Sequence, residues 1–275
     1  MPTRNAKVRV ARLAGRQFGR ISRAQLRACG LSNATLSDWC EQRYLFRVLP
    51  RVYAVGHRAR STEAKLAEAL LYAGPGAMLS HATAAWWLGL ATSQPYMIDV
   101  STPRRCRAIP RISVHGRRRL QRDWHRDLPV TQFTQTLLDY AGAVSLTQVR
   151  VALARADYDG ELNLAAISSR LTRGCRGSVK LRRALERHRP MLARARSGLE
   201  VDLFELCEAN QLPLPELNAD FAGWTVDALW RRERLAVELE GPATIGPQRR
   251  SDETGVRSSI FEPPDSPSSA TQMSR

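Results

Sequence analysis

The stretch RISRAQLRACGLSNATLSDWCEQRYLFRVLPRVYAV, residues 20–55, decides the fold of the N-terminal part of the chain. Ser22 can cap a helix over Arg23–Cys29, because its hydroxyl can accept a hydrogen bond from a free N–H group of the first turn. Gly30 then ends that helix, and Ser32 can cap a second helix over Asn33–Gln42. Two helices joined by a short glycine turn have the spacing of a helix-turn-helix.

Two short strands are predicted on the C-terminal side of these helices. They cover Tyr44–Leu49 and Arg51–Val55 and meet at Pro50, while a further helix over Arg9–Phe18 precedes the pair. A helix-turn-helix that is followed by a two-stranded hairpin is a winged helix-turn-helix. We assign this fold to residues 1–60.

The second helix of a DNA-binding helix-turn-helix presents its side chains to base edges in the major groove. The contacts predicted from this helix and from the wing are Asn33, Thr35, Ser37, Gln42, Arg43, Arg47 and Arg51. Asp38 and Glu41 lie on the same helix and would repel phosphate. A winged helix that binds another protein is therefore the alternative.

The charge of the chain favours a polyanionic partner. Its 42 basic and 26 acidic residues leave a net charge of +16, and 39 of the basic residues are arginine. Such a positive field attracts phosphate backbones, which makes double-stranded DNA the expected partner. A GC-rich coding sequence would also raise the arginine content, without any functional cause.

Composition also argues against several other classes of protein. No apolar run approaches the length of about 18 residues that a transmembrane helix needs, so no membrane partner is expected. The five cysteines are scattered and form no C-x-x-C motif. This pattern argues against a disulfide framework or a zinc site and indicates a reducing cytoplasm.

Residues 61–190 are predicted to form a mixed α+β domain. Strands are expected over Tyr96–Ser101 and Arg111–His115, where apolar residues alternate. The segment Arg182–Arg196 holds six arginines around Pro190 and is predicted to be a linker. The expected helices are Ser61–Ala73, Ser80–Leu90, Gln135–Val144, Leu146–Ala156, Leu164–Leu171 and Ser178–His188.

A second informative stretch is WTVDALWRRERLAVELEG, residues 224–241. If Arg231–Arg234 form the loop of a hairpin, Trp230 pairs with Leu235 and Asp227 lies opposite Glu238. Strand alternation then places Thr225, Asp227, Glu238 and Glu240 on one face. A helix from Gly198 to about Asn210 precedes this hairpin, and Ser197 with Glu200 has the pattern of a capping box.

Two carboxylates that face each other on neighbouring strands repel. Proteins keep such a pair when a divalent cation lies between the acids or when one of them stays protonated. Mg²⁺ is therefore the expected cofactor, because it would activate water and neutralise a phosphodiester in the transition state. The alternatives are that the acids are solvated residues on an edge hairpin, and that Glu200 is only a helix cap.

The motifs of the C-terminal part resemble a known nuclease group. The Ser-x-x-Glu helix, Val-Asp-x-x-Trp and Val-Glu-Leu-(Asp/Glu)-Gly look like the Vsr-like branch of the PD-(D/E)XK nuclease-like superfamily, which often follows a winged helix in actinobacterial proteins. The resemblance implies that Asp227 and Glu238 bind the metal and that Glu200 completes the catalytic site. Glu240 stands where that motif has its lysine, so the usual water-orienting base is missing.

The N-terminal part is similar to AbiEi-type antitoxins of type IV toxin–antitoxin systems. This likeness rests on ISRAQL (21–26), VYAVG (52–56), LSHATAAWWLGL (79–90), LPVT (128–131) and TLLD (136–139). It implies a DNA-binding antitoxin with a cognate toxin as a further partner. No partner for His81 can be named from the sequence, so packing is the simpler explanation of that histidine.

The nuclease-like family continues beyond the hairpin with a His-containing turn, a basic helix and a further strand. Residues 242–275 supply none of these, because five Pro and seven Ser in the last 35 residues predict a disordered tail. Residues 191–241 are thus expected to be a partial α/β restriction-endonuclease-like domain, truncated or frame-shifted at its end.

The functional hypothesis is a DNA-binding regulator that resembles an antitoxin and carries a degenerate nuclease-like C-terminus. The alternative is a Mg²⁺-dependent DNA endonuclease whose winged helix is a targeting arm. A third hypothesis is a decayed gene product with a damaged C-terminus. The fold class expected in all three cases is α+β.

Overall fold

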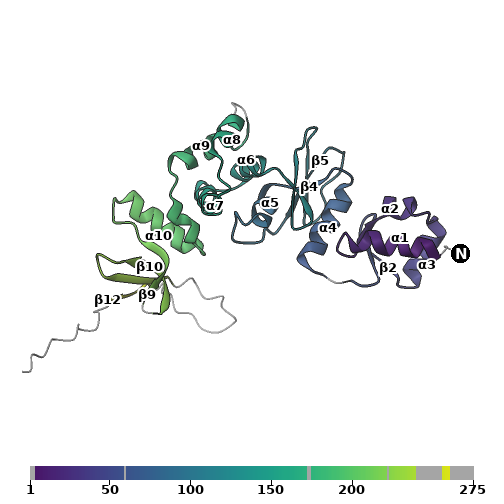
Figure 1. Cartoon of the computed structure of the whole chain (residues 1–275), viewed down its shortest axis with the longest axis horizontal. Helices are drawn as coiled ribbons and strands as arrows, with labels where there is room; N and C mark the ends of the chain where they lie inside the picture. The colour runs from purple at the N-terminus through teal and green to yellow at the C-terminus, as the bar shows by residue number, and fades with distance from the viewer. Residues whose placement is uncertain (1–3, 59, 172–174, 222, 240–255, 261–275) are drawn as a thin grey trace, which may run out of the picture. The chain divides into compact units, whose positions relative to one another are not determined.

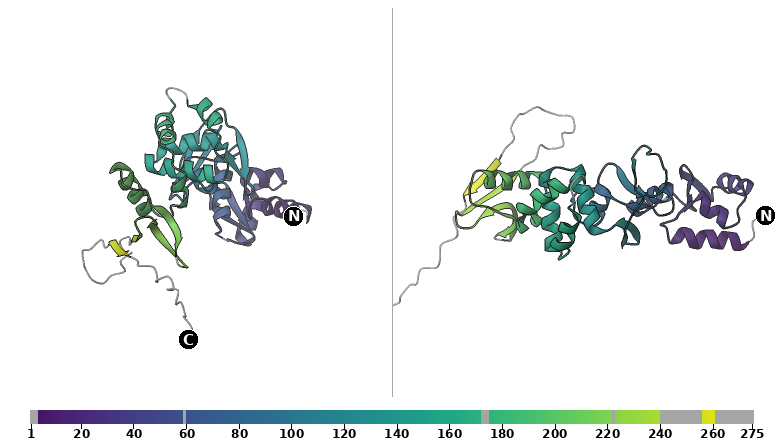
Figure 2. Two further views of the ribbon diagram at one scale, coloured as in Figure 1. Left: turned by 60° about the vertical axis from the view of Figure 1, so that its left-hand side comes forward. Right: turned by 90° about the horizontal axis from the view of Figure 1, so that it is seen from above.

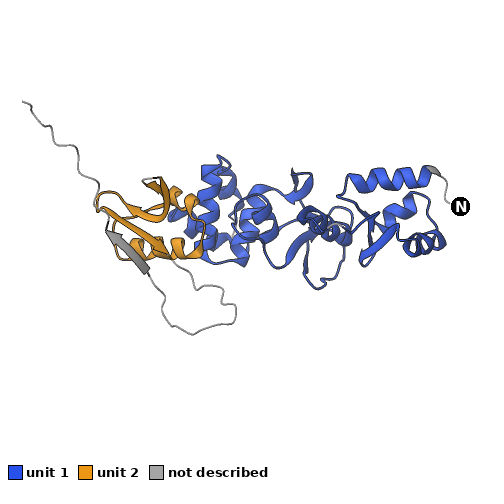
Figure 3. Ribbon diagram, turned by 90° about the horizontal axis from the view of Figure 1, so that it is seen from below, with its two compact units in different colours: residues 1–188 blue, residues 189–275 orange. Residues whose placement is uncertain are grey.

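The computed structural model describes residues 4–58, 60–171, 175–221, 223–239 and 256–260. The chain is an α+β protein that divides into two compact units, residues 1–188 and 189–275 (Figure 3). Among the described residues, no helix has the length and apolar character needed to cross a membrane.

The N-terminal part of the first unit contains three helices and a small sheet, which are the elements expected for a winged helix-turn-helix (Figure 1). Ser22 and Ser32 cap their helices as predicted, since each hydroxyl accepts a hydrogen bond from the backbone N–H three residues on. Gly30, at φ +88°, lies in the turn between the two helices. The elements are α1 (Arg4–Gly15), β1 (Arg20–Ser22), α2 (Arg23–Ala28), α3 (Asn33–Glu41), β2 (Leu45–Leu49) and β3 (Val52–Val55).

The wing is a three-stranded antiparallel sheet in the order β1-β3-β2, one strand larger than predicted. Strand β1 has only three residues, Arg20–Ser22, which is too short for an alternating pattern to be recognised. Val10, Ile21, Leu26 and Trp39 pack together beneath the sheet. This core packs residues of α1, α2 and α3 against residues of the sheet.

A buried ion pair joins the winged helix to the next element, α4 (Thr62–Ala73). Arg20 is 1% exposed, and its Nε donates a hydrogen bond to Oε1 of Glu68 at 2.6 Å. Helix α4 also contacts all three strands of the wing. Residues 1–60 are therefore part of one compact unit that extends to residue 188, which differs from the division that the sequence suggested at residue 60.

The centre of the first unit is a mixed five-stranded sheet in the order β6-β5-β4-β8-β7. Strand β4 pairs in parallel with β8 and antiparallel with β5. Leu79, Val100 and Val130 on three of the strands pack with Leu66 of α4 and Trp87 of α5 (His81–Trp87). The strands are β4 (Met78–Leu79), β5 (Ile98–Thr102), β6 (Ile112–Gly116), β7 (Arg122–His125) and β8 (Leu128–Thr131).

Four helices gather beside α5 (Figures 1 and 2). They are α6 (Phe133–Ala143), α7 (Leu146–Tyr158), α8 (Leu164–Arg170) and α9 (Ser178–Glu186), each at its predicted place. Their core contains Leu137, Leu153, Ile167 and Leu181. Gly177 precedes α9 as its N-cap at φ +92°, and a Cβ there would lie 2.3 Å from the carbonyl oxygen of Leu138, so only glycine lets α9 approach α6 this closely.

The second unit contains a helix and an antiparallel sheet in the order β12-β11-β10-β9. The expected linker Arg182–Arg196 is largely structured, because α9 extends to Glu186 and a 3-10 helix, η1, covers Pro190–Arg194. Leu192 is fully buried, and this apolar contact orders a segment whose composition is dominated by arginine. The remaining elements are α10 (Gly198–Ala209), β9 (Glu216–Phe221), β10 (Trp224–Trp230) and β11 (Leu235–Leu239).

The prediction that residues 242–275 form a disordered tail is wrong at β12 (Val256–Ile260). This strand pairs along the whole of β11, from Leu235 opposite Ile260 to Leu239 opposite Val256. Backbone N–H and C=O groups of an edge strand are satisfied by any extended segment, whatever its side chains. A composition rich in serine and proline therefore hid a strand that is held by backbone pairing.

Candidate functional sites

The structure places the predicted DNA contacts on α3 and on the wing. Ser37 and Gln42 are exposed on or next to α3, and Arg43, Arg47 and Arg51 are exposed at the wing. None of these three arginines forms an ion pair within the described part of the chain. Their charges are thus directed to solvent, where a phosphate backbone could bind them.

Two residues of the predicted contact set have local partners. Oδ1 of Asn33 accepts hydrogen bonds from Arg23 at 3.0 Å and from Arg27 at 2.9 Å, both on α2. The hydroxyl of Thr35 is 3.0 Å from that of Ser32 at the helix cap. Asn33 therefore positions two cations of α2 at the start of α3, a role that its place in the sequence did not reveal.

The register of the carboxylate hairpin is confirmed. Trp230 pairs with Leu235 and Ala228 with Val237, and the same register continued by one pair sets Asp227 opposite Glu238. Oδ2 of Asp227 accepts a hydrogen bond from the backbone N–H of Leu239 at 2.7 Å. Desolvation raises the pKa of Glu238 above its usual range, and the charge of Asp227 and a hydrogen bond to it raise that pKa further.

Glu200, the third acid predicted for this site, forms hydrogen bonds with Arg196 and Asn218. It is 3% exposed, and Oε2 accepts hydrogen bonds from the backbone N–H of Arg196 at 2.7 Å and from the side-chain amide of Asn218. Its own N–H donates to Ser197 in the helix cap. Within the described residues no three His, Cys, Asp or Glu side chains gather as a metal site.

Glu240 lies outside the described residues. Asp227 and Glu238 are thus the two predicted acids that the described structure brings together. Mg²⁺ is commonly bound by one or two carboxylates with water and phosphate as its other ligands. The two carboxylates could supply at most part of such a ligand set.

The Asp227→Asn variant is expected to be more stable than the wild type at pH 7 in buffer that contains EDTA. The substitution removes the charge that raises the pKa of Glu238, while the amide oxygen still accepts the Leu239 hydrogen bond. Because an acid whose pKa is raised by folding destabilises the folded state above that pKa, the gain should fade as Glu238 becomes protonated. Urea denaturation at pH 7 and pH 4 measures both effects.

Glu233→Gln in the exposed hairpin loop is the matched control, because it removes one negative charge away from the pair. At concentrations above its dissociation constant, Mg²⁺ should raise the urea concentration at which the wild type is half unfolded. It should leave Asp227→Asn unchanged. Equal stability of wild type and Asp227→Asn at pH 7 would contradict a repulsive pair.

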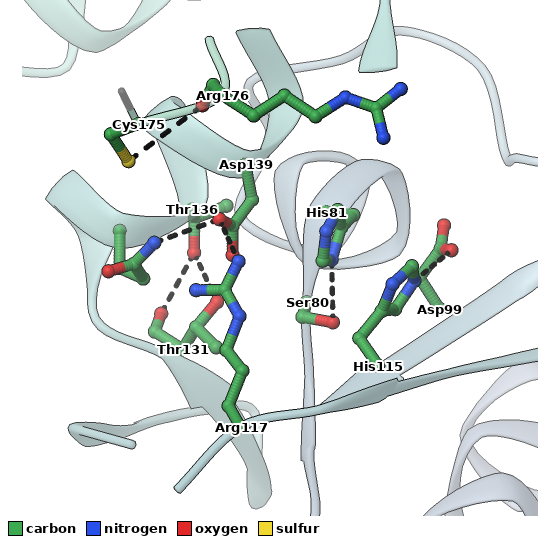
Figure 4. A network of polar contacts seen from close by, with 11 residues as sticks. Ser80, His81, Asp99, His115, Arg117, Thr131, Thr136, Asp139, Cys175 and Arg176 are labelled. Atoms are coloured by element: carbon green, nitrogen blue, oxygen red, sulfur yellow. Dashed lines mark hydrogen bonds and ion pairs between the residues drawn. The ribbon is translucent and has the colours of Figure 1, made fainter. Parts of the chain in front are cut away.

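A network of polar side chains occupies the middle of the first unit (Figure 4). The rings of His81 and His115 stack with centroids 3.7 Å apart and an interplanar angle of 19°. Nε2 of His115 lies 2.9 Å from Oδ1 of Asp99, and Nδ1 of His81 lies 3.0 Å from Oγ of the buried Ser80. Two histidines are thus held face to face, each by a separate oxygen.

A second part of this network is centred on Asp139 of α6. Its Oδ1 accepts hydrogen bonds from the guanidinium of Arg117 and from the side-chain amide of Gln135, the latter at 2.8 Å. Thr136 donates to the backbone oxygen of Thr131 at 2.9 Å. Burial raises the pKa of Asp139, although Arg117 opposes this change.

His81 has the most perturbed environment in this cluster. Its pKa falls to about 4, first because of desolvation and then because of the charges of His115, Arg117 and Arg176. The backbone of His81 is also left-handed, at φ +51°, which is uncommon for a residue other than glycine. Perturbed groups and backbone strain concentrate at functional sites, so this cluster is a candidate site, one that was not predicted from the sequence.

The chain sequence did contain a signal for this cluster. His81, Thr131 and Asp139 come from three of the motifs that carry the resemblance to AbiEi-type proteins, and the fold brings these motifs together. His115 and Arg117 come from none of those motifs. The partners of His81 are therefore distant in sequence, and only the pairing of β5 with β6 brings His115 beside the start of α5.

Comparison with known proteins adds little to these sites. No family model matches the chain, and no curated protein is significantly similar to it. A solved structure that resembles it is that of the RV2827C protein from Mycobacterium tuberculosis, with 18% identity and a TM-score of 0.41. The match covers 69% of this chain and 79% of that protein, and it is too loose to assign a shared fold or function.

Proposed function

We propose that the protein is a DNA-binding regulator that uses its winged helix-turn-helix to bind double-stranded DNA. The observation that supports this most strongly is the set of exposed arginines on the wing beside an exposed face of α3. Phosphate contacts from the wing would position the helix, and Ser37 and Gln42 would reach base edges in the major groove.

The whole chain supports the same partner through its charge. A net charge of +16 steers a polyanion toward the protein and adds sequence-independent affinity. Asp38 and Glu41 are exposed on α3 and act against phosphate binding along that helix. The wing arginines therefore have to supply the main attraction, and α3 has to supply specificity.

An antitoxin role in the cytoplasm, with a cognate toxin as the protein partner, is part of this proposal. It rests on the AbiEi-like motifs of the N-terminal part. A toxin encoded by an adjacent reading frame should arrest growth when expressed alone, and co-expression of this protein should restore growth. Arrest that persists on co-expression would leave the regulator without its antitoxin role.

The Arg43→Ala/Arg47→Ala/Arg51→Ala variant tests the contact with DNA. Binding of a duplex should weaken for every sequence, roughly tenfold or more at low salt, because three phosphate contacts are lost. The slope of log K against log salt should fall by up to about 2.7, since each contact contributes about 0.9. Fluorescence anisotropy with labelled duplexes between 50 and about 300 mM salt measures both quantities.

The matched control is Arg118→Ala/Arg119→Ala/Arg183→Ala, which removes three exposed arginines from other elements of the same unit. It lowers the net charge equally and should retain most of the affinity. If the two triple variants lose the same affinity, the general field binds DNA and the wing does not.

A Mg²⁺-dependent DNA endonuclease is the second candidate function, because Asp227 and Glu238 face each other on β10 and β11. Mg²⁺ at this pair would supply charge neutralisation at a phosphodiester. Incubation of supercoiled plasmid with Mg²⁺ tests it. Cleavage that Asp227→Asn abolishes would establish the enzyme, and intact plasmid would favour the regulator.

A further inference from the structure

A groove of about 1040 Å³ lies in the first unit between the helix-turn-helix and the central sheet. Its walls come from α2 and the turn before β1 on one side, and from α4, the segment after β5 and the β7–β8 region on the other. Apolar residues from these elements also line it, and we refer to them as its floor: Phe18, Leu70, Leu71, Ala73, Leu128 and Pro129. Six arginines also line it, and we call it the arginine groove: Arg16, Arg23, Arg27, Arg51, Arg104 and Arg105.

The arginine groove carries a large uncompensated positive charge. Within the described part of the chain, none of its six guanidinium groups forms an ion pair with a carboxylate. Asp127 is the acidic residue among those that line it. Asn33 holds Arg23 and Arg27 together through one amide oxygen. Six like charges around one concave surface favour an anionic ligand with several charges.

The floor and one aromatic side chain restrict the kind of anion. Trp124 lines the groove with 61% of its surface exposed, and the guanidinium of Arg122 lies 5.8 Å from the centre of its ring. An exposed indole next to arginines is the arrangement on which unpaired bases stack. A duplex turns its bases inward, whereas a single strand offers both phosphates and base faces.

We propose that the arginine groove binds single-stranded nucleic acid. The phosphates lie along the six arginines, and the bases pack on the apolar floor and on Trp124. This site is separate from the duplex contact on α3 and the wing, except that Asn33 and Arg51 lie at both. The protein would thus hold a duplex and an unpaired strand on neighbouring surfaces of one unit.

The Arg104→Glu/Arg105→Glu variant tests the groove, with Arg118→Glu/Arg119→Glu as the control of equal charge outside it. The probes are fluorescently labelled oligo-dT and oligo-U of about 12 nucleotides. Fluorescence anisotropy measures their binding over a range of salt concentrations. The groove variant should lose at least about tenfold in affinity, and its salt slope should fall by about 1.4 for two lost contacts. The control should change affinity by less than about twofold.

A preference for oligo-U over oligo-dT, or the reverse, identifies RNA or DNA as the natural strand, and both results support the proposal. If Arg104→Glu/Arg105→Glu fails to fold by circular dichroism, Arg16→Glu/Arg27→Glu on the opposite wall replaces it. The proposal is overturned if the groove and control variants lose affinity equally. It is also overturned if poly-glutamate displaces the oligonucleotide at matched charge, because the groove would then be a site for an acidic peptide.

Two further variants separate this site from the duplex site. Trp124→Ala should weaken oligonucleotide binding with an unchanged salt slope, because it removes stacking and no phosphate contact. Arg43→Ala/Arg47→Ala, which leaves the groove intact, should weaken duplex binding and spare the oligonucleotide. Loss of both ligands in Arg43→Ala/Arg47→Ala would mean that one surface binds both and would refute a separate groove site.

Discussion

The Glu68→Gln variant is expected to lower the free energy of unfolding of the first unit by about 3–5 kcal/mol. Arg20 is 1% exposed, so the substitution leaves a cation in the interior without its counter-charge. Arg20 keeps its hydrogen bond from Nη1 to the carbonyl oxygen of Phe18 at 3.4 Å, but the negative charge of Glu68 that offsets the lost hydration of the guanidinium is removed, and this loss makes the cost large. Urea denaturation, followed by circular dichroism, measures the change.

A double variant that removes both charges tests whether the cost of Glu68→Gln comes from the unpaired charge. Arg20→Met/Glu68→Met removes both charges and should be closer to the wild type than Glu68→Gln, since apolar replacements of a buried pair are often neutral. Glu63→Gln, at the first turn of the same helix, is the control and should cost less than about 1 kcal/mol. If Glu68→Gln also costs less than about 1 kcal/mol, the ion pair contributes little to the stability of the first unit.

The second large effect concerns pH, and His81 is its source. Folding lowers the pKa of His81 from 6.5 to about 4, so the unfolded chain binds a proton between these values that the folded chain does not. Stability is therefore complete above about pH 6.5 and falls as the pH drops toward 4. At 1.36 kcal/mol per pKa unit, the loss approaches about 3 kcal/mol.

The comparison of wild type with His81→Asn isolates this contribution. Asparagine tolerates the left-handed backbone at this position and does not titrate. The raised pKa of Asp139 acts in the opposite direction, because a carboxyl with a raised pKa in the folded state stabilises that state on acidification. Both proteins contain Asp139, so the difference between their stabilities at pH 7 and at pH 4.5 reports His81.

His57→Asn is the control, because it replaces an exposed histidine of the same unit. Its stability should follow the wild type at both pH values. Parallel loss of stability in wild type and His81→Asn on acidification would show that another group governs the acid transition.

Local chemistry explains why the sequence predicted so much of the fold. The hydroxyls of Ser22, Ser32, Ser61 and Ser145 each accept a backbone N–H of their own helix, so these helix starts depend only on neighbours in the chain. The hairpin register followed in the same way from a four-residue loop, Arg231–Arg234. Both features require no information from distant segments.

Elements without a local signal were missed for the opposite reason. Strand β4 has two residues, Met78 and Leu79, and it exists because β5 and β8 lie on either side of it. Strand β12 exists because β11 offers unpaired backbone groups. Neither strand has an alternating apolar pattern in the sequence, because each is formed by pairing with neighbouring strands.

The sequence by itself determined the two capped helices near the N-terminus, the hairpin register of the second unit and the excess of arginine. Only the tertiary structure decided which distant side chains meet: Arg20 with Glu68, His81 with His115, and six arginines around one groove. The physical reason is the separation in sequence of the residues that interact. Caps and turns depend on bonds between residues a few positions apart, whereas burial and shared charge arise only when the packing of helices and sheets brings remote residues together.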